Sequence, residues 1–277
     1  MAVWTKNVHK LIPSFGIRFS QRSSVDEIDV QRLNRLADVW WNEDGEMRLL
    51  HSMNKLRIKF IVNGLVNTGR ITQKDYNKPE PLEGMKLLDV GCGGGILAEP
   101  LARLGANTTG LDAGKDLIDV AKVHAAKDPA LAARLCYMHN TIEEHADHNK
   151  ETYDAVVASE VIEHVADKKI FVDRCVATLK PGGSFFLTTP CKSFVSWFGG
   201  IILAEKILRL VPDGVHDWEK FIAPKELESL LDTYDCRTIL VHGMRCNPLT
   251  GQWSWTKYAP LTYALHAVKK ASTQAQS

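Results

Sequence analysis

A glycine-rich segment that follows a short apolar stretch has the residue types and spacing of a ligand-binding loop. Leu87–Gly95 reads LLDVGCGGG, and Asp112 lies 21 residues after Gly91. Closely spaced glycines let the backbone approach a ligand without Cβ clashes, and a helix N-terminus directly afterwards would offer free N–H groups. A dinucleotide loop needs a small residue where this chain has Ile96, so a grip on a pyrophosphate is disfavoured. The pattern predicts a nucleoside site in which Asp112 accepts both ribose hydroxyls.

A second set of polar residues follows Tyr153–Ser159, an apolar stretch typical of a central parallel strand. Glu160, Glu163 and His164 are three and four positions apart, so in a helix their side chains would share one face. Together they could bind a divalent cation such as Mg²⁺, which would lower the pKa of a hydroxyl group. Without a metal, the imidazole could act as a general base. In a third interpretation the acids only stabilise a helix N-terminus and His164 packs.

Alternating strand-like and helix-like stretches must position these residues. The predicted strands are 86–90, 108–111, 135–138, 153–159, 184–189, 238–241 and 263–268, and the predicted helices among them are 96–104, 117–127 and 170–179. Before them, residues 26–65 have helical periodicity with a break at 42–45, and 73–84 is a polar linker. The alternation predicts an α/β fold with a mostly parallel sheet of seven strands and helices on both faces. Ligands would bind at the carboxyl ends of the strands.

The composition excludes several classes of protein. The chain has 277 residues, 45% of them hydrophobic, and 34 Lys and Arg against 33 Asp and Glu. A net charge of +1 argues against a nucleic-acid binder that is held by phosphate contacts. Six dispersed cysteines without a C-x-x-C pair argue against a zinc ribbon. No stretch has the roughly 18 uninterrupted apolar residues of a transmembrane helix.

The charge of the N-terminal segment differs from the near-neutral balance of the whole chain, because no acidic residue precedes Asp26. Four basic residues before it, Lys6, Lys10, Arg18 and Arg22, are mixed with apolar residues and serines. The apolar run is too interrupted for a secretory signal. The composition predicts a mitochondrial transit peptide over residues 1–22, and the alternative is a disordered basic tail.

The glycine loop, with an acid two residues before G-x-G-x-G, resembles that of class I S-adenosylmethionine (SAM) methyltransferases. From about Ile28 to Ala267 the chain resembles the mitochondrial ubiquinone-biosynthesis O-methyltransferases. The motifs that carry this resemblance are Trp40-Trp41, Leu49-Leu50-His51, Leu56-Arg57, Leu88–Glu99, Glu143-Glu144-His145, Glu163-His164-Val165, Ile207–Pro212 and His216-Asp217.

The resemblance implies a Rossmann-like class I fold and methylation, by SAM, of catechol-type hydroxyls on polyprenylated aromatic precursors of ubiquinone. The implied cofactor contacts are Arg57, Gly91, Asp112 and Ser159, to which the loop adds Gly93 and the stretch after the third predicted strand adds Thr141, near the adenine. The implied metal ligands are Glu160, Glu163 and His164, of which Glu160 and His164 are the candidate catalytic residues. His216 is either a substrate contact or an ordinary loop histidine. The alternatives are another small hydroxyl or amine substrate, or a scaffold without catalysis.

An apolar segment, 194–211, is too short and too charged to span a membrane. On a helical wheel its later apolar residues cluster opposite Glu205, Lys206 and Arg209, which predicts an interfacial amphipathic helix. Such a helix would suit a polyprenylated substrate, and the alternative is a core or dimer helix. The expected location is the matrix side of the mitochondrial inner membrane, in a peripheral protein that takes part in a ubiquinone-biosynthesis complex.

The chain is therefore expected to form one SAM-dependent methyltransferase domain over residues 26–270. Its predicted parts are an N-terminal helical cap and linker (26–84), a cofactor-binding core (85–190), a helical insertion between the fifth and sixth strands that faces the acceptor or membrane (191–235), and the final strands (236–270), followed by a disordered tail (271–277).

Overall fold

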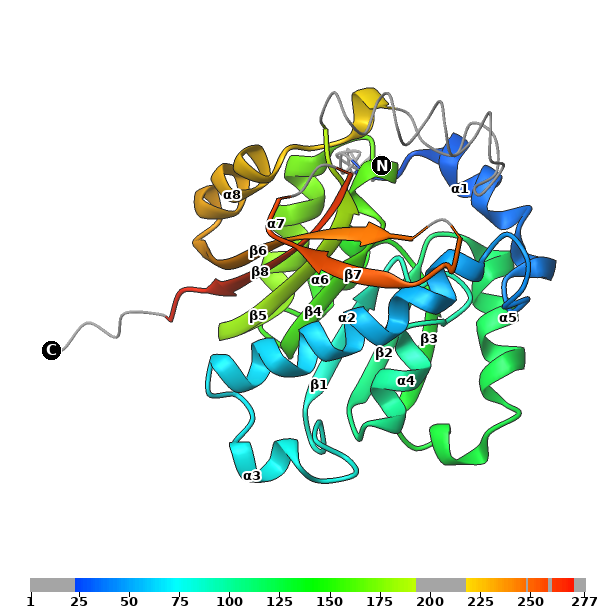
Figure 1. The fold of residues 1–277 in the computed structure, drawn as a ribbon, viewed down its shortest axis with the longest axis horizontal. Helices are drawn as coiled ribbons and strands as arrows, with labels where there is room; N and C mark the ends of the chain where they lie inside the picture. The colour runs from blue at the N-terminus through cyan, green and yellow to red at the C-terminus, as the bar shows by residue number, and fades with distance from the viewer. Residues whose placement is uncertain (1–22, 193–217, 248, 259–260, 272–277) are drawn as a thin grey trace, which may run out of the picture.

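The computed structural model describes residues 23–192, 218–247, 249–258 and 261–271 (Figure 1). The predicted transit peptide, the amphipathic segment 194–211, His216 and nearly all of the predicted tail lie outside the described residues. No helix in the described ranges combines the length and the apolar character that a membrane span requires.

A single sheet forms the centre of the fold. Its strands are β1 (Lys86–Val90), β2 (Asn107–Asp112), β3 (Leu135–His139), β4 (Tyr153–Ser159), β5 (Leu179–Pro190), β6 (Cys236–Cys246), β7 (Trp253–Thr256) and β8 (Thr262–Lys269). The order across the sheet is β3-β2-β1-β4-β5-β8-β6-β7. The first five strands in this order are parallel, and β8, β6 and β7 pair antiparallel to their neighbours. The mostly parallel α/β sheet is as predicted, with one strand more than the seven expected.

The additional strand, β7, folds back onto the extended end of β6. Gly243 to Cys246 pair with Thr256 to Trp253 in an antiparallel hairpin. The sixth predicted strand, 238–241, covers only the middle of β6, whose 11 residues continue into this hairpin. The tip of the hairpin includes Gly251, which adopts a φ of 67°.

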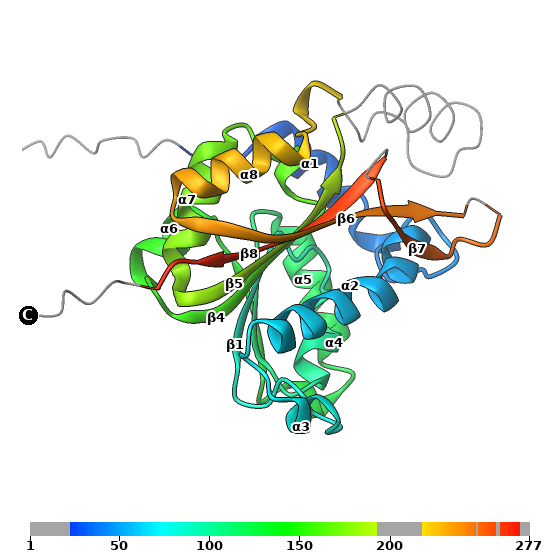
Figure 2. The same ribbon diagram turned by 60° about the vertical axis from the view of Figure 1, so that its left-hand side comes forward.

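Helices cover both faces of the sheet. They are α1 (Glu27–Asn34), α2 (Arg48–Asn67), α3 (Gln73–Tyr76), α4 (Ala98–Arg103), α5 (Lys115–Ala125), α6 (Ile142–His148), α7 (Lys168–Thr178) and α8 (Pro224–Thr233). α2, α4 and α5 lie on one side, and α6, α7 and α8 lie on the other (Figure 2). The predicted helix over 26–65 is divided into α1 and α2, and α6 has no counterpart in the prediction.

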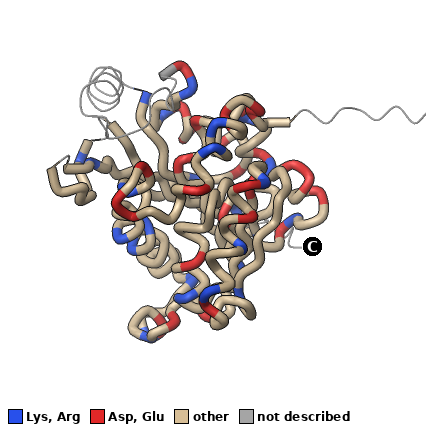
Figure 3. The backbone as a smooth tube through the Cα atoms, turned by 90° about the vertical axis from the view of Figure 1, so that its right-hand side faces the viewer, with Lys and Arg blue, Asp and Glu red and all other residues tan. Residues whose placement is uncertain are grey.

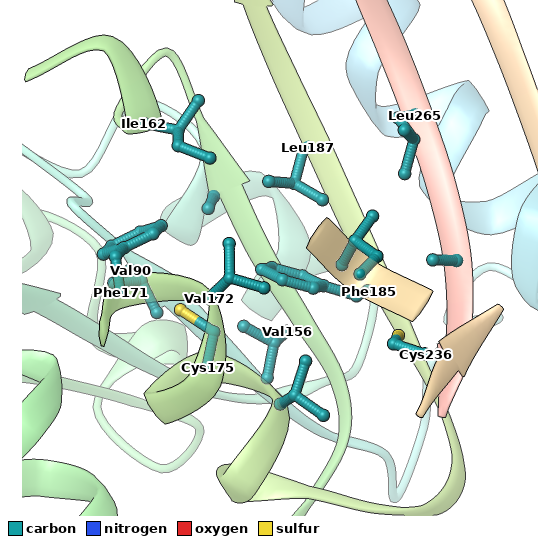
Figure 4. Packing of buried hydrophobic residues seen from close by; sticks show 14 of the residues in the cluster. Val90, Val156, Ile162, Phe171, Val172, Cys175, Phe185, Leu187, Cys236 and Leu265 are labelled. Atoms are coloured by element: carbon teal, nitrogen blue, oxygen red, sulfur yellow. The ribbon is translucent and has the colours of Figure 1, made fainter. Parts of the chain in front are cut away.

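Side chains that alternate along the strands fill a core on each face. Leu88, Val156 and Phe185 belong to the core under α7 and α8, of which Figure 4 labels Val156 and Phe185. Their neighbours Leu87 and Phe186 point to the opposite core, which is covered by α2 and α4. Acidic and basic residues are interspersed along the described backbone (Figure 3).

Candidate cofactor and acceptor site

The glycine loop leaves β1 in a conformation that favours glycine. Gly91, Gly93 and Gly95 have φ values of 69°, 54° and 93°, in the left-handed region that residues with a Cβ rarely adopt. A Cβ on Gly91 would lie 2.5 Å from a methyl group of Val161. The Gly91 N–H donates to the Leu111 carbonyl at 2.7 Å, which holds the loop against β2. The strand–loop–helix–strand unit that the sequence predicted is therefore present.

Two tryptophans from the N-terminal segment pack on this loop. The Trp40 indole lies beside Gly93 and Gly94 so closely that a Cβ on either glycine would collide with it. Trp41 donates from Nε1 to the Gly94 carbonyl at 2.9 Å, and its ring stacks on His124 with centroids 3.4 Å apart. The loop therefore has a wall that comes from residues more than 50 positions earlier in the chain.

Asp112 ends β2 beside the glycine loop. Its carboxylate accepts from the Gly93 N–H at 2.8 Å and from the Gly114 N–H at 2.7 Å. Burial raises the pKa of Asp112, while these two backbone hydrogen bonds lower it. The residue lines the cavity described below, as a carboxylate that binds a ribose must do.

Arg57 is buried, with 5% of its surface exposed, although its helical neighbours Lys55 and Lys59 are exposed. Nη1 donates to Ser159 Oγ at 2.9 Å, and Nη2 donates to Asn54 Oδ1 at 2.5 Å. The structure thus joins two predicted cofactor contacts, Arg57 and Ser159, that are 102 positions apart. Arg57 is therefore not a solvated residue of an exposed helix face.

Arg57 also lies in the electrostatic field of two carboxylates. Burial lowers its pKa to about 10, and Glu160 and Asp89 act in the opposite direction. Burial raises the pKa of Asp89 to about 7, Arg57 lowers it, and Asp112 raises it. Asp89 is 2% exposed, and its Oδ2 has no hydrogen-bond partner among the described residues. Asp89 is not among the predicted site residues. Its position two residues before the first glycine of the loop could have indicated that it lies at the site.

The segment after β4 does not begin a helix, which corrects the predicted arrangement of Glu160, Glu163 and His164. Glu160 has a φ of 59°, and only a single 3₁₀ turn, Ile162–His164, follows it. The Glu160 N–H still pairs with the Thr188 carbonyl at 2.8 Å, so contact with β5 fixes the turn. The three side chains therefore do not share a helical face. Within the described ranges, no cluster of three His, Cys, Asp or Glu residues has the arrangement of a metal site.

The two glutamates nevertheless have properties that fit a cation. Oε1 of Glu160 and Oε1 of Glu163 are buried, and neither has a hydrogen-bond partner in the described part of the chain. Glu163 accepts from Thr189 Oγ1 at 2.8 Å through its other oxygen. Burial and the nearby Glu160 raise the pKa of Glu163 well above its usual range. A carboxylate pair of this kind suits a hard cation or a shared proton.

His164 contacts an acid that the sequence did not indicate. Its Nδ1 lies 3.4 Å from Oδ2 of Asp29, a buried residue of α1. Lys220 Nζ lies 2.8 Å from the same oxygen and 2.7 Å from Oδ2 of Asp26. The pKa of Asp29 is lowered by its hydrogen bond with His164 and further by Lys220, while burial opposes the change. The contact with Lys220 is that of an ion pair, which favours the charged form of the Asp29 carboxylate.

One cavity of about 380 Å³ lies at the carboxyl ends of β1, β2 and β4. Of the predicted site residues that the structure describes, all except Gly93 line it. Thr141 enters the lining as the N-cap of α6, where its hydroxyl accepts from the Glu144 N–H at 3.3 Å. Apolar side chains, among them Met53 and Phe171, make up much of the remaining wall. The cavity therefore joins a polar end suited to a nucleoside with an apolar region.

Comparisons with known proteins agree with this geometry. Residues 71–241 match the family model described as a methyltransferase domain. The chain is 46% identical over 251 residues to the mitochondrial ubiquinone biosynthesis O-methyltransferase of Rattus norvegicus, covering 91% of this chain and 72% of the relative. It is 37% identical over 250 residues to the ubiquinone biosynthesis O-methyltransferase of Vibrio parahaemolyticus, covering 90% of this chain and 99% of the relative. The chain belongs to the ubiquinone biosynthesis O-methyltransferases.

A solved structure shows that this member of the O-methyltransferases has the predicted class I fold. Magnesium protoporphyrin IX methyltransferase from Synechocystis, with bound SAH, superposes with a TM-score of 0.60. The two sequences are 18% identical, and the match covers 88% of this O-methyltransferase and 96% of the other chain. At that identity the likeness concerns the fold.

Proposed function

We propose that this chain transfers the methyl group of SAM to catechol-type hydroxyls of polyprenylated aromatic intermediates in ubiquinone biosynthesis. The observation that carries the proposal is that Gly91 and Asp112 line the same cavity as Glu160 and Glu163. Membership of the ubiquinone biosynthesis O-methyltransferases supports the reaction class. In-line transfer from the sulfonium to a hydroxyl oxygen needs donor and acceptor to be aligned in one space, with no covalent intermediate.

The cofactor end of the cavity supplies groups for each part of SAM. Asp112 would accept the ribose hydroxyls as charge-assisted hydrogen bonds, with Gly91 and Gly93 giving close backbone approach. The guanidinium of Arg57, which already bonds Ser159, suits the methionine carboxylate. Thr141 would border the adenine.

The pKa of Asp89 predicts how SAM binding depends on pH. SAM brings a sulfonium and an ammonium into a cavity in which Asp89, with a pKa of about 7, is ionised above neutrality. The ionised fraction rises from roughly 10% at pH 6 to roughly 90% at pH 8, so we expect the affinity to rise about ninefold over this range. Calorimetric titrations at several pH values would measure it. The affinity of Asp89→Asn for SAM should hardly change over the same pH range. If the affinities of the two proteins depend equally on pH, Asp89 is not the group responsible.

The acceptor end would hold the hydroxyl in its nucleophilic form. Glu160 and Glu163 each present a buried oxygen that has no hydrogen-bond partner among the described residues. These oxygens would fit Mg²⁺ or a similar cation, with His164 as a third ligand or as the base. When bound, such a cation would lower the pKa of the catechol hydroxyl. The apolar wall around Met53 and Phe171 excludes water from the transfer.

Turnover of labelled SAM tests the function. The acceptors are a polyprenyl dihydroxybenzoate and a demethylated quinol, each with and without EDTA. We expect transfer to a ring hydroxyl and a loss of at least about tenfold in rate after chelation. Full activity in EDTA would remove the cation from the mechanism. Transfer to neither acceptor, with intact SAM binding, would favour another substrate or a scaffold.

We further propose that the protein is a peripheral protein of the matrix side of the mitochondrial inner membrane, in a ubiquinone-biosynthesis complex. The support is the name of the mitochondrial relatives, the composition of residues 1–22 and the amphipathic pattern of 194–211. Co-sedimentation with anionic liposomes tests whether the segment 194–211 binds a membrane surface. Unchanged binding after replacement of its apolar residues by polar ones would contradict the proposal.

A further inference from the structure

The residues just before α1, together with its first turn, form a strap, defined here as residues 24–29, that is bound along the turn after β4. Val25 and Val165 form an antiparallel bridge, and the Ala166 N–H donates to the Ser24 carbonyl at 2.7 Å. On its other side the Ser24 N–H donates to Oε1 of Glu143 at 2.9 Å, and Ser24 is 1% exposed. The strap is therefore fixed by backbone pairing to the same turn that carries His164.

Asp29, at the end of the strap, is 4% exposed and contacts three cationic or ionisable side chains. Its Oδ2 lies 3.4 Å from His164 Nδ1 and 2.8 Å from Lys220 Nζ, and its Oδ1 lies 3.3 Å from Arg32 Nη1. A second carboxylate, Asp26, also binds Lys220, at 2.7 Å. Lys220 therefore has an ion-pair partner without Asp29, whereas of these two carboxylates Asp29 is the one seen in contact with His164.

The chemistry of this contact fixes the imidazole. An ionised carboxylate has no hydrogen to donate, so His164 Nδ1 must carry the hydrogen of the bond. In the neutral ring Nε2 then holds the lone pair, which is the form needed by a metal ligand or a general base. His164 and Asp29 both line the cavity, so a residue of the strap fixes which ring nitrogen of His164 carries the hydrogen and which one can bind or accept.

We propose that Asp29 is a positioning residue for methyl transfer, which holds His164 in the Nδ1–H tautomer and in one orientation. The proposal rests on the function proposed above, because it assigns Asp29 a role in that reaction. Lys220 binds the same carboxylate oxygen and stands two residues before Ile222, which bridges Cys191 after β5. The carboxylate that contacts the imidazole is thereby also bound to the segment 218–222, which pairs with Cys191.

Two matched variants separate the imidazole contact from the ion pair with Lys220. We expect Asp29→Asn to lower kcat about 10- to 100-fold, the usual effect of losing an orienting carboxylate. The KM for SAM should change less than about twofold, because Asp29 orients a group on the acceptor side. Asp26→Asn, which removes a Lys220 partner but no histidine contact, should keep kcat within about threefold. Equal effects of the two variants on kcat would overturn the proposal.

A spectroscopic measurement tests the pair without turnover. Nitrogen-15 NMR of the histidine rings at pH 8, with His164 assigned by the signal missing in His164→Asn, reports which nitrogen carries the hydrogen. We expect a protonated Nδ1 in the wild-type protein and a mixture of tautomers in Asp29→Asn. A wild-type ring protonated at Nε2 would overturn the proposal even if Asp29→Asn failed to fold. The expected tautomer together with no methyl transfer would instead contradict the proposed function.

Discussion

Replacement of Asp112 by alanine should weaken SAM binding about a hundredfold. The substitution removes a carboxylate that would accept two charge-assisted hydrogen bonds from the ribose, each worth about 1.5–3 kcal/mol, and about 2.7 kcal/mol corresponds to a hundredfold in Kd. It also leaves the N–H groups of Gly93 and Gly114 without their acceptor, so the loop loses preorganisation. Isothermal titration with SAM measures the change.

The matched control for Asp112 is Asp116, an exposed acid in the first turn of α5. Asp116→Ala changes the net charge by the same amount next to the same cavity and should alter the Kd by less than about twofold. If both variants bind SAM equally well, Asp112 is not the ribose carboxylate.

Arg57→Met should lower the free energy of unfolding by about 3–5 kcal/mol. This is the usual cost of removing one partner from a buried set of charges, because the remaining charges stay buried without compensation. Here the set includes Asp89 and Glu160, and Ser159 loses its donor at 2.9 Å. Methionine has a similar length, so loss of packing contributes little. Urea denaturation monitored by circular dichroism measures the change.

Lys55, two positions earlier on the same helix, provides the comparison. It is exposed, so Lys55→Met should change the free energy of unfolding by less than about 0.5 kcal/mol. Similar losses for both variants would show that Arg57 contributes as an ordinary surface residue does.

The parts of the site that could be predicted from the sequence depend on local geometry. Gly91, Gly93 and Gly95 adopt left-handed backbone conformations, which glycine adopts more readily than other residues, so the residue type alone indicates the turn. Asp112 followed from the same unit, since the end of the next strand lies beside the loop in every parallel βαβ arrangement. The family resemblance added Arg57 and Ser159, whose contact spans 102 positions and has no local signal.

The shared helical face considered for Glu160, Glu163 and His164 is not formed, because long-range pairing overrides a local spacing rule. The spacing of the acids is that of a first helical turn, but the Glu160 N–H is held by Thr188 on β5. Asp29 was missed for a related reason. In the sequence it is one of several acids near a helix start, and only the strap places it against His164, 135 positions later.

The packing of Trp40 and Trp41 on the glycine loop bears on the order in which parts of the chain fold. The N-terminal strap and these tryptophans leave the ribosome before their partners His124, Glu143 and Val165, which follow roughly 80 to 140 positions later. Contacts of such large sequence separation form late, since the loop-closure entropy must be overcome first. We therefore expect the cavity to close only after the sheet has formed, as one of the last folding events of a newly made chain.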